Sequence, residues 1–498
     1  MIAKIQYLFF NVGFVLILLH ISTIQVNAQS ATPTPSPQPT HCQPYGDVNC
    51  DQEVNALDFS LLHTQFGSSD FNADINSSLL VDAADVEKYL SNYKYNTDLL
   101  PRKVITFISE DIFPELQTDL EVFKEDVHES LGVEIDIQPL TSAQQTPEII
   151  RSFLQNECEW DERLGCRNLE GVILVGDLPF ARFSEPYSYG EKAIFVYYYE
   201  DLDATFTVDD EGYFTGYASL GAQEGPEIYS AWIKPMVYPE ANSLPDDLQV
   251  APRDSTTQLK DYFAKHHRFF TGQVSPQFEA VFASHCAGSV NSTFAALVLP
   301  LYGLDHTTSI TPDAGCDAIC PLNEAVKTAL SQPVELSFLH SHGTPSVIWC
   351  FNSLDFQTFV HLPLFMATWG CNNGNFDGNE NNSTALSFIH GPDIGLSYFA
   401  KLHSSDIAAN DYTHDFINPA DFFAYWNNGD YVGKAYLRMS RLFRHKPSFL
   451  ERVNNHRLVA YSVYRESGPL QRIIIGSPFS YSKVGYARSH PSVLVQAE

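Results

Sequence analysis

From about residue 102, short apolar runs alternate with segments in which apolar residues recur every three or four positions. Runs of strand length that are apolar throughout are typical of strands buried on both faces, and the recurring segments are typical of amphipathic helices. The expected strands are 104–108, 133–137, 171–176, 279–282, 334–339 and 362–368, and the expected helices are 115–131, 147–154 and 257–270. The pattern therefore predicts an α/β sheet flanked by helices.

The last two of these strands run into reactive residues. Residues 334–339 lead into a His-Ser-His-Gly segment that contains His342 and Gly343, and residues 362–368 lead into Cys371. The carboxyl ends of strands are where an α/β sheet presents functional groups. A thiol needs a base to become a thiolate, and backbone N–H donors to hold the oxyanion that it generates. We therefore expect a cysteine nucleophile paired with a histidine.

Length and charge narrow the class of protein. A chain of 498 residues with 44% hydrophobic residues is long enough for more than one domain. The formal net charge of -31, from 60 acids and 29 bases, argues against nucleic acid and anionic membranes as partners, because their phosphates require a basic face. Cations such as calcium suit this charge better.

The first 41 residues predict export. Residues 1–28 combine Lys4, an apolar stretch and a small-residue cleavage site, which together describe a secretory signal peptide. An uncleaved membrane anchor is the alternative, although the apolar stretch is shorter than a bilayer span. Residues 29–41 form a Pro/Thr-rich linker with extended geometry. We expect a secreted, extracellular or scaffold-associated protein without a membrane segment after signal cleavage.

Export makes disulfides possible, and the chain has nine cysteines. An odd count leaves at least one thiol unpaired, and Cys371 is our candidate for it. The remaining pairing stays open: Cys42 with Cys50 and Cys158 with Cys166 are short-range candidates, and Cys316 or Cys320 could pair with Cys286 or Cys350.

A repeat within residues 42–95 predicts calcium binding. Oxygen side chains recur at positions 1, 3, 5, 9 and 12 of two loops, as a seven-coordinate calcium ion requires, and each loop precedes a helical segment. The expected ligands are Asp47, Asn49, Asp51, Glu53, Asn55 and Asp58 in the first loop, and Asp74, Asn76, Ser78, Leu80, Asp82 and Asp85 in the second.

These two loops resemble a type I dockerin, a small all-α module with two calcium ions. The resemblance covers residues 42–95 and implies a cohesin-type domain as partner. The chain departs from the pattern at loop position 6, where Gln52 and Leu79 replace the usual Gly. Ser78 also replaces an acidic ligand, so the second site is expected to bind calcium more weakly.

Several blocks between residues 102 and 485 resemble the gingipain-like cysteine peptidases, which have a caspase-type fold. They are 171–179, 198–203 with 209–212, 226–228, 339–343, 367–374 and 475–478. The resemblance implies that His342 is the base, that Cys371 is the nucleophile, and that Glu185 orients the imidazole. The N–H groups of Gly343 and Cys371 would form the oxyanion hole. Residues 486–498 form a C-terminal tail.

His340 is the alternative base. It alternates with His342, so both face the same side of an extended segment, but the family pattern places Gly directly after the base. We expect His340 to be a packed residue that supports the site. A zinc site built from His340, His342, Cys350 and Cys371 would have suitable ligands without a characteristic spacing. Cys371 could also be a core residue or half of a disulfide.

The chain departs from the family near the substrate. Basic-specific relatives carry an Asp at the position that lines up with Val196, and residues 230–233 stand where relatives show a Gly-Arg-Ile run. Val cannot neutralise a buried Arg or Lys side chain, so no cleaved residue is assigned. The acidic segment 201–212 resembles a calcium-holding turn as much as a substrate pocket.

The preferred interpretation is a secreted cysteine endopeptidase that acts on proteins or peptides and attaches to a cohesin scaffold. One alternative is a glycoside hydrolase, because dockerins often accompany polysaccharide enzymes. The other is a non-catalytic, calcium-dependent adhesion or scaffold protein. The sequence has no Gly-x-Ser-x-Gly elbow and no His-Glu-x-x-His helix motif.

Overall fold

The computed structural model describes residues 102–161, 165–184, 192–218, 226–237, 253–284, 301–310, 323–370, 372–376, 383–402, 419–427, 429–443 and 472–482, with Gln65 and Val81. The expected signal peptide, linker and C-terminal tail lie outside these residues. So does the dockerin-like module, apart from Gln65 and Val81. None of the described helices combines the length and the hydropathy that crossing a bilayer requires.

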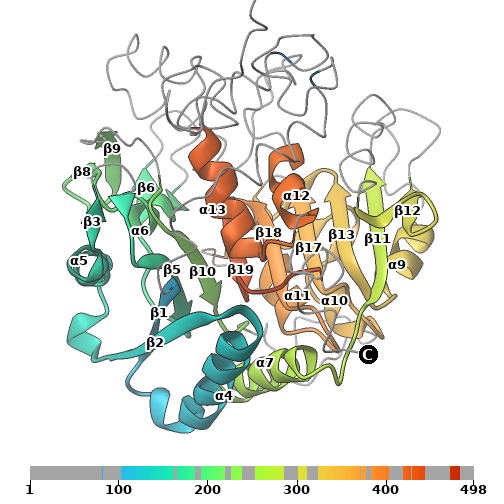
Figure 1. Cartoon of the computed structure of the whole chain (residues 1–498), viewed down its shortest axis with the longest axis horizontal. Helices are drawn as coiled ribbons and strands as arrows, with labels where there is room; N and C mark the ends of the chain where they lie inside the picture. The colour runs from blue at the N-terminus through green and yellow to red at the C-terminus, as the bar shows by residue number, and fades with distance from the viewer. Residues whose placement is uncertain are drawn as a thin grey trace, which may run out of the picture.

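A ten-stranded sheet runs through the described part of the molecule, in the order β12-β11-β13-β17-β18-β19-β10-β5-β1-β2. The same order can be followed across Figure 1. Its strands are β1 (Arg102–Ser109), β2 (Val133–Leu140), β5 (Leu169–Val175), β10 (Tyr229–Ile233), β11 (Gln277–Ser284), β12 (Thr307–Ile310), β13 (Val334–His340), β17 (Phe365–Trp369), β18 (Ser397–Lys401) and β19 (Arg472–Gly476).

The sheet consists of two parallel halves that run in opposite directions. Neighbouring strands pair in parallel except for β18 and β19, where Ser397 pairs with Gly476 and Lys401 pairs with Arg472. The carboxyl ends of β13 and β17 therefore lie at one edge of the sheet, and those of β5 and β10 at the opposite edge. The sequence pattern did not predict this reversal.

The apolar runs form the expected central strands. β13 is buried from Val334 to Leu339, and the last five residues of β5 are buried as well. Each large apolar side chain that is fully buried contributes roughly 1.5–3 kcal/mol to folding. β17 begins at Phe365, three residues later than predicted, because Pro363 has no N–H to donate to a neighbouring strand. The sequence therefore located these strands to within a few residues.

Local signals explain where the helices begin and end. The Asp254 and Ser383 side chains cap α7 and α11 by accepting from the N–H groups of Thr257 and Leu386. Gly132 ends α4 in the left-handed conformation, with φ 63°. The helices are α4 (Phe113–Leu131), α5 (Pro147–Glu157), α6 (Tyr197–Glu200), α7 (Ser255–Phe270), α9 (Asn323–Leu330), α10 (Asp355–Thr358), α11 (Thr384–Ile389), α12 (Pro419–Asn427), α13 (Val432–Phe443) and the 3₁₀ turn η2 (Ser142–Gln144).

Helices cover both faces of the sheet at β17 and β18. Phe365 and Phe399 face α12, where the Phe399 ring stacks on Phe422 with 5.0 Å between centroids. Tyr398 points to the other face, with its ring 5.5 Å from Phe388 of α11. Successive strand residues point to opposite faces, so one strand supplies the core of both layers.

Three smaller sheets complete the described fold. β14 (Gly343–Thr344), β15 (Val347–Ile348) and β16 (Phe351–Asn352) form a meander directly after β13. β6 (Arg182–Ser184), β7 (Lys192–Ile194), β8 (Thr205–Val208) and β9 (Phe214–Ala218) form a four-stranded sheet. β3 (Trp160–Asp161) and β4 (Gly165–Cys166) form a hairpin. The Cys158–Cys166 disulfide at this hairpin confirms the short-range pairing expected there.

Candidate active site

The two histidines at the end of β13 have different surroundings. His340 is the last residue of the strand, and its Nδ1 lies 3.1 Å from the Ser284 hydroxyl oxygen on β11. His342 follows two residues later and is exposed. His340 is thus a packed residue tied to the neighbouring strand, as predicted, while His342 can meet a molecule from solution.

Short hydrogen bonds hold the backbone around His342. The Ser341 hydroxyl donates to the His342 carbonyl (2.7 Å), and the Trp349 N–H donates to the Ser341 oxygen (3.0 Å). The Trp349 N–H also lies 3.4 Å from the His342 carbonyl oxygen. Trp349 itself adopts φ 60°, a left-handed conformation that is unfavourable for a bulky residue. The loop therefore presents His342 from a fixed backbone.

The ladder between β14 and β15 fixes the direction of the Gly343 N–H. Gly343 pairs with Ile348, and Thr344 pairs with Val347. Antiparallel pairs alternate between hydrogen-bonded and non-hydrogen-bonded types. The Trp349 to His342 contact makes Gly343–Ile348 the non-hydrogen-bonded pair. The Gly343 N–H therefore points away from β15.

Cys371 lies outside the described residues, but both of its flanks are described. His340 pairs with Trp369 across β13 and β17. A Cβ atom built on Gly370 would lie 3.3 Å from the Ser341 carbonyl oxygen, so Gly370 packs directly against the His342 loop. Asn372 follows with φ 57°. The chain around Cys371 and the chain around His342 are therefore neighbours, as the sequence predicts for a Cys–His pair.

Glu185 also lies outside the described residues, directly after β6. The described chain before it approaches the segment that follows Cys371. The rings of Phe180 and Phe376 are 5.6 Å apart, and Trp232 lies 6.4 Å from Phe376. The role of Glu185 stays a prediction.

The residues that depart from the family pattern are interior. Val196 precedes α6 and is fully buried, and Trp232 on β10 is also fully buried. The Trp232 ring lies 6.1 Å from the ring of Tyr199. Neither side chain is exposed to a bound peptide.

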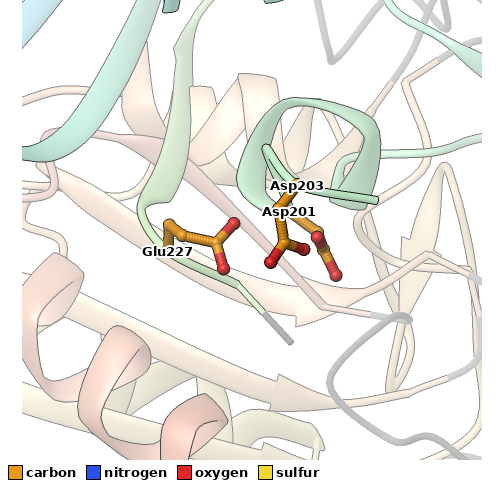
Figure 2. Close-up of side chains that lie close together, drawn as sticks. All are labelled: Asp201, Asp203 and Glu227. Carbon is orange, nitrogen blue, oxygen red and sulfur yellow. The ribbon is translucent and has the colours of Figure 1, made fainter. Parts of the chain in front are cut away.

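The acidic segment 201–212 divides into two parts. Asp209 accepts hydrogen bonds from the N–H groups of Glu211 and Tyr213, both at 2.9 Å, and so stabilises the β8–β9 turn. Asp201 and Asp203 instead approach Glu227, and one oxygen of each of these three side chains lies within 4.8 Å of the others (Figure 2). The sequence blocks include Glu227, but no spacing signal linked it to Asp201.

Backbone N–H groups bond to two of these carboxylates, and the Arg151 side chain bonds to the backbone beside them. Glu227 accepts from the Leu202 N–H at 2.6 Å, and Asp201 accepts from the Ala204 N–H at 3.0 Å. The Arg151 guanidinium donates to the Asp201 carbonyl at 2.9 Å. Burial lowers the pKa of Arg151, and neighbouring acidic groups that include the cluster act in the opposite direction. Calcium at this turn stays a prediction.

Glu200 is a buried carboxyl group that the sequence did not single out. It accepts from the Ser230 N–H (3.1 Å), the Ser230 hydroxyl (2.5 Å) and the Tyr436 hydroxyl (2.9 Å). Burial raises the pKa of Glu200 to about 8, although these hydrogen bonds act to lower it. The side chain connects α6, β10 and α13, which no local pattern could reveal.

The expected calcium ligands of the dockerin-like module all lie outside the described residues. They are Asp47, Asn49, Asp51, Glu53, Asn55, Asp58, Asp74, Asn76, Ser78, Leu80, Asp82 and Asp85. Calcium binding by these loops and the cohesin-type partner stay predictions.

The chain has a distant structural likeness to solved structures. No protein-family model and no curated protein matches the chain. The chain is similar to separase in the Saccharomyces cerevisiae separase–securin complex, with 11% identity and a TM-score of 0.33. The match covers 84% of this chain, which spans about a quarter (27%) of that longer one. A likeness this low carries no argument about activity.

Proposed function

We propose that this chain is a cysteine endopeptidase in which His342 and Cys371 form the catalytic pair. The observation that carries the proposal is the contact between the two strand ends. Gly370 packs against Ser341, and Asn373 bonds to the hairpin that follows His342. The resemblance of residues 102–485 to gingipain-like peptidases, with their caspase-type fold, supports the same assignment.

The proposed reaction needs few groups. His342 accepts the proton of the Cys371 thiol, and the thiolate attacks the scissile carbonyl carbon. The N–H groups of Gly343 and Cys371 hold the oxyanion, and the imidazolium returns its proton to the leaving amine. Water then hydrolyses the thioester, which releases the acid and restores the thiol. Glu185 would orient the His342 ring.

The proposed substrates are proteins or peptides without a fixed preference for Arg or Lys. A basic side chain that enters a pocket needs an acid to neutralise it, and Val196 supplies none at the expected position. Because Val196 is fully buried, other residues would line the pocket.

The sequence supports further proposals about location and cofactor. The protein would be secreted, and the calcium-loaded module of residues 42–95 would dock it on a cohesin-type domain. A further calcium ion would bind at the 201–212 turn, where Asp201, Asp203 and Glu227 are the described carboxylates best placed to hold it.

The test of the activity is cleavage of a mixed-sequence fluorogenic peptide library with calcium and reductant. We expect turnover by the wild type, and none by Cys371→Ala or His342→Ala. The matched control is His361→Ala, which removes a partly exposed histidine paired with Asp393 and should leave turnover unchanged. Peptide turnover that survives Cys371→Ala would refute the proposal. Glycan hydrolysis that survives thiol alkylation would favour a glycoside hydrolase instead.

Disulfide mapping tests the thiol itself. Cys350 is disulfide-bonded, and the two other described cysteines bond to each other. Alkylation of the non-reduced protein, followed by peptide mass spectrometry, should find Cys371 modified. A Cys350–Cys371 bridge would contradict a nucleophilic role for Cys371.

A further inference from the structure

The described residue with the most direct connection to both halves of the proposed pair is Asn373. It lies two positions after Cys371, and its side chain is completely buried. We infer that Asn373 is a positioning residue that sets the distance between the Cys371 thiol and the His342 ring. This inference rests on the proposed function.

Asn373 bonds to the hairpin that begins at His342. Its Nδ2 donates to the Thr344 carbonyl at 2.7 Å and to the Val347 carbonyl at 3.0 Å. These two residues form the hydrogen-bonded pair of the β14–β15 ladder. One side-chain amide therefore joins the chain directly after the nucleophile to both strands of the hairpin after the base.

Glycines on both sides make room for this carboxamide. A Cβ atom on Gly343 would overlap the Asn373 oxygen, and so would a Cβ atom on Gly370. The two glycines next to the catalytic residues are thus sterically required by one buried side chain. Any larger residue at either position would push Asn373 away and separate the two loops.

The backbone on each side of the carboxamide is also fixed. Asn372 adopts φ 57°, a conformation that Asn tolerates better than most residues, and it turns the chain sharply after Cys371. On the hairpin side, the Thr384 N–H donates to the Pro345 carbonyl at 2.8 Å. The Thr384 hydroxyl lies 3.5 Å from the Asn373 carbonyl oxygen. Asn373 therefore connects two segments that are individually anchored.

The oxygen of the Asn373 carboxamide argues against a purely structural role for this residue. Asn373 Oδ1 is buried and accepts no hydrogen bond within the described chain. An unpartnered buried oxygen opposes folding, so stability alone would not favour Asn at this position. On the hairpin side, the Val347 N–H donates to the Thr344 hydroxyl oxygen at 3.1 Å, so the turn that Asn373 contacts is also held by a bond of its own.

The experiment compares Asn373→Ala with Asn168→Ala. Asn168 is a matched control because its side chain also makes two bonds to backbone, to Glu157 and Glu159, in the other half of the sheet. We expect both substitutions to lower the midpoint of thermal unfolding. Only Asn373→Ala should reduce kcat, by at least about 10-fold with KM nearly unchanged, since small displacements of reacting groups cost rate. Asn373→Asp, which replaces the donor by an acceptor, should be equally impaired.

A second readout does not depend on turnover. The rate at which iodoacetamide modifies Cys371 reports the thiolate fraction at each pH. The rise of that rate with pH should shift to higher pH in Asn373→Ala and stay unchanged in Asn168→Ala. Equal effects of the two substitutions on kcat and on this profile would overturn the inference. Peptide turnover in the Cys371→Ala protein would overturn the proposed function instead, and the alkylation profile would still decide the role of Asn373.

Discussion

The buried carboxyl group of Glu200 should make the stability of the protein fall as the pH rises. The side chain is fully buried between α6, β10 and α13, and burial raises its pKa from 4.5 to about 8. Glu200→Gln keeps the size of the side chain and an oxygen that can accept from Ser230. Its amide can donate to the Tyr436 oxygen. The substitution therefore removes the ionisation with little change in packing.

The sign and the size follow from the two pKa values. Between pH 4.5 and about pH 8 the folded state holds a proton that the unfolded state has released, so stability falls as the pH rises. One pKa unit corresponds to about 1.4 kcal/mol, and the full shift is worth at most about 5 kcal/mol. We expect Glu200→Gln to match the wild type within about 1 kcal/mol near pH 5. Near pH 8 it should be more stable by about 3 kcal/mol.

The assay is urea unfolding followed by tryptophan fluorescence at several pH values, in a Cys371→Ala background that prevents self-cleavage. Burial lowers the pKa of His266 and of His390 to about 3, and that of Lys265 to about 7. These three groups make stability rise with pH over parts of the same range. They are present in both proteins, so the difference in unfolding free energy between variant and wild type isolates Glu200.

A difference that stays constant from pH 5 to pH 8 would refute this reasoning. It would mean that Glu200 releases its proton equally easily in the folded and the unfolded chain. Tyr436→Phe is the companion variant, because it removes the hydroxyl that donates to Glu200 at 2.9 Å. It should steepen the loss of stability with pH, since a carboxylate with fewer donors is harder to ionise.

Three further predictions concern other parts of the fold. Gly343→Ala should destabilise the protein by about 1–3 kcal/mol and lower kcat, because the new methyl group overlaps Asn373. An unfolding free energy and a kcat equal to those of the wild type would contradict this contact. Cys158→Ser should lower the unfolding free energy by about 2–3 kcal/mol, because it removes the disulfide to Cys166 that closes this loop. Reductant should then shift the unfolding midpoint of the variant less than that of the wild type. Equal shifts in the two proteins would argue against this disulfide. If the Asp201–Asp203–Glu227 cluster binds calcium, the ion should raise the unfolding temperature of the wild type more than that of Asp203→Asn. Equal increases in the two proteins would mean that calcium binds elsewhere.

Local pattern was enough to find many of the elements. The helix predicted at 115–131 is α4 (Phe113–Leu131), and the strand predicted at 334–339 is β13 (Val334–His340). Periodicity and capping act between residues a few positions apart, so they can be read along the chain. The same holds for the Cys158–Cys166 disulfide, whose partners are eight positions apart.

The sequence also distinguished the two histidines after β13. The alternation places His340 and His342 on the same side, and the resemblance to gingipain-like peptidases, which have Gly after the base, favoured His342. The structure ties His340 to Ser284 and leaves His342 exposed. The last residue of a central strand still packs against the neighbouring strand, while the residues that follow the strand can be exposed to solvent. The difference in exposure between the two histidines therefore agrees with the choice of His342 over His340.

Only the tertiary structure decided which distant residues meet. β19 (Arg472–Gly476) joins β10 in parallel and β18 in antiparallel, so the two halves of the sheet run in opposite directions. Glu227 approaches Asp201 and Asp203, and Asn373 bonds to the carbonyls of the hairpin after β13. These contacts depend on how whole layers pack, and no spacing along the chain encodes them. The sequence by itself determined many of the elements and the residue types at their ends, while packing determined which distant residues become their neighbours.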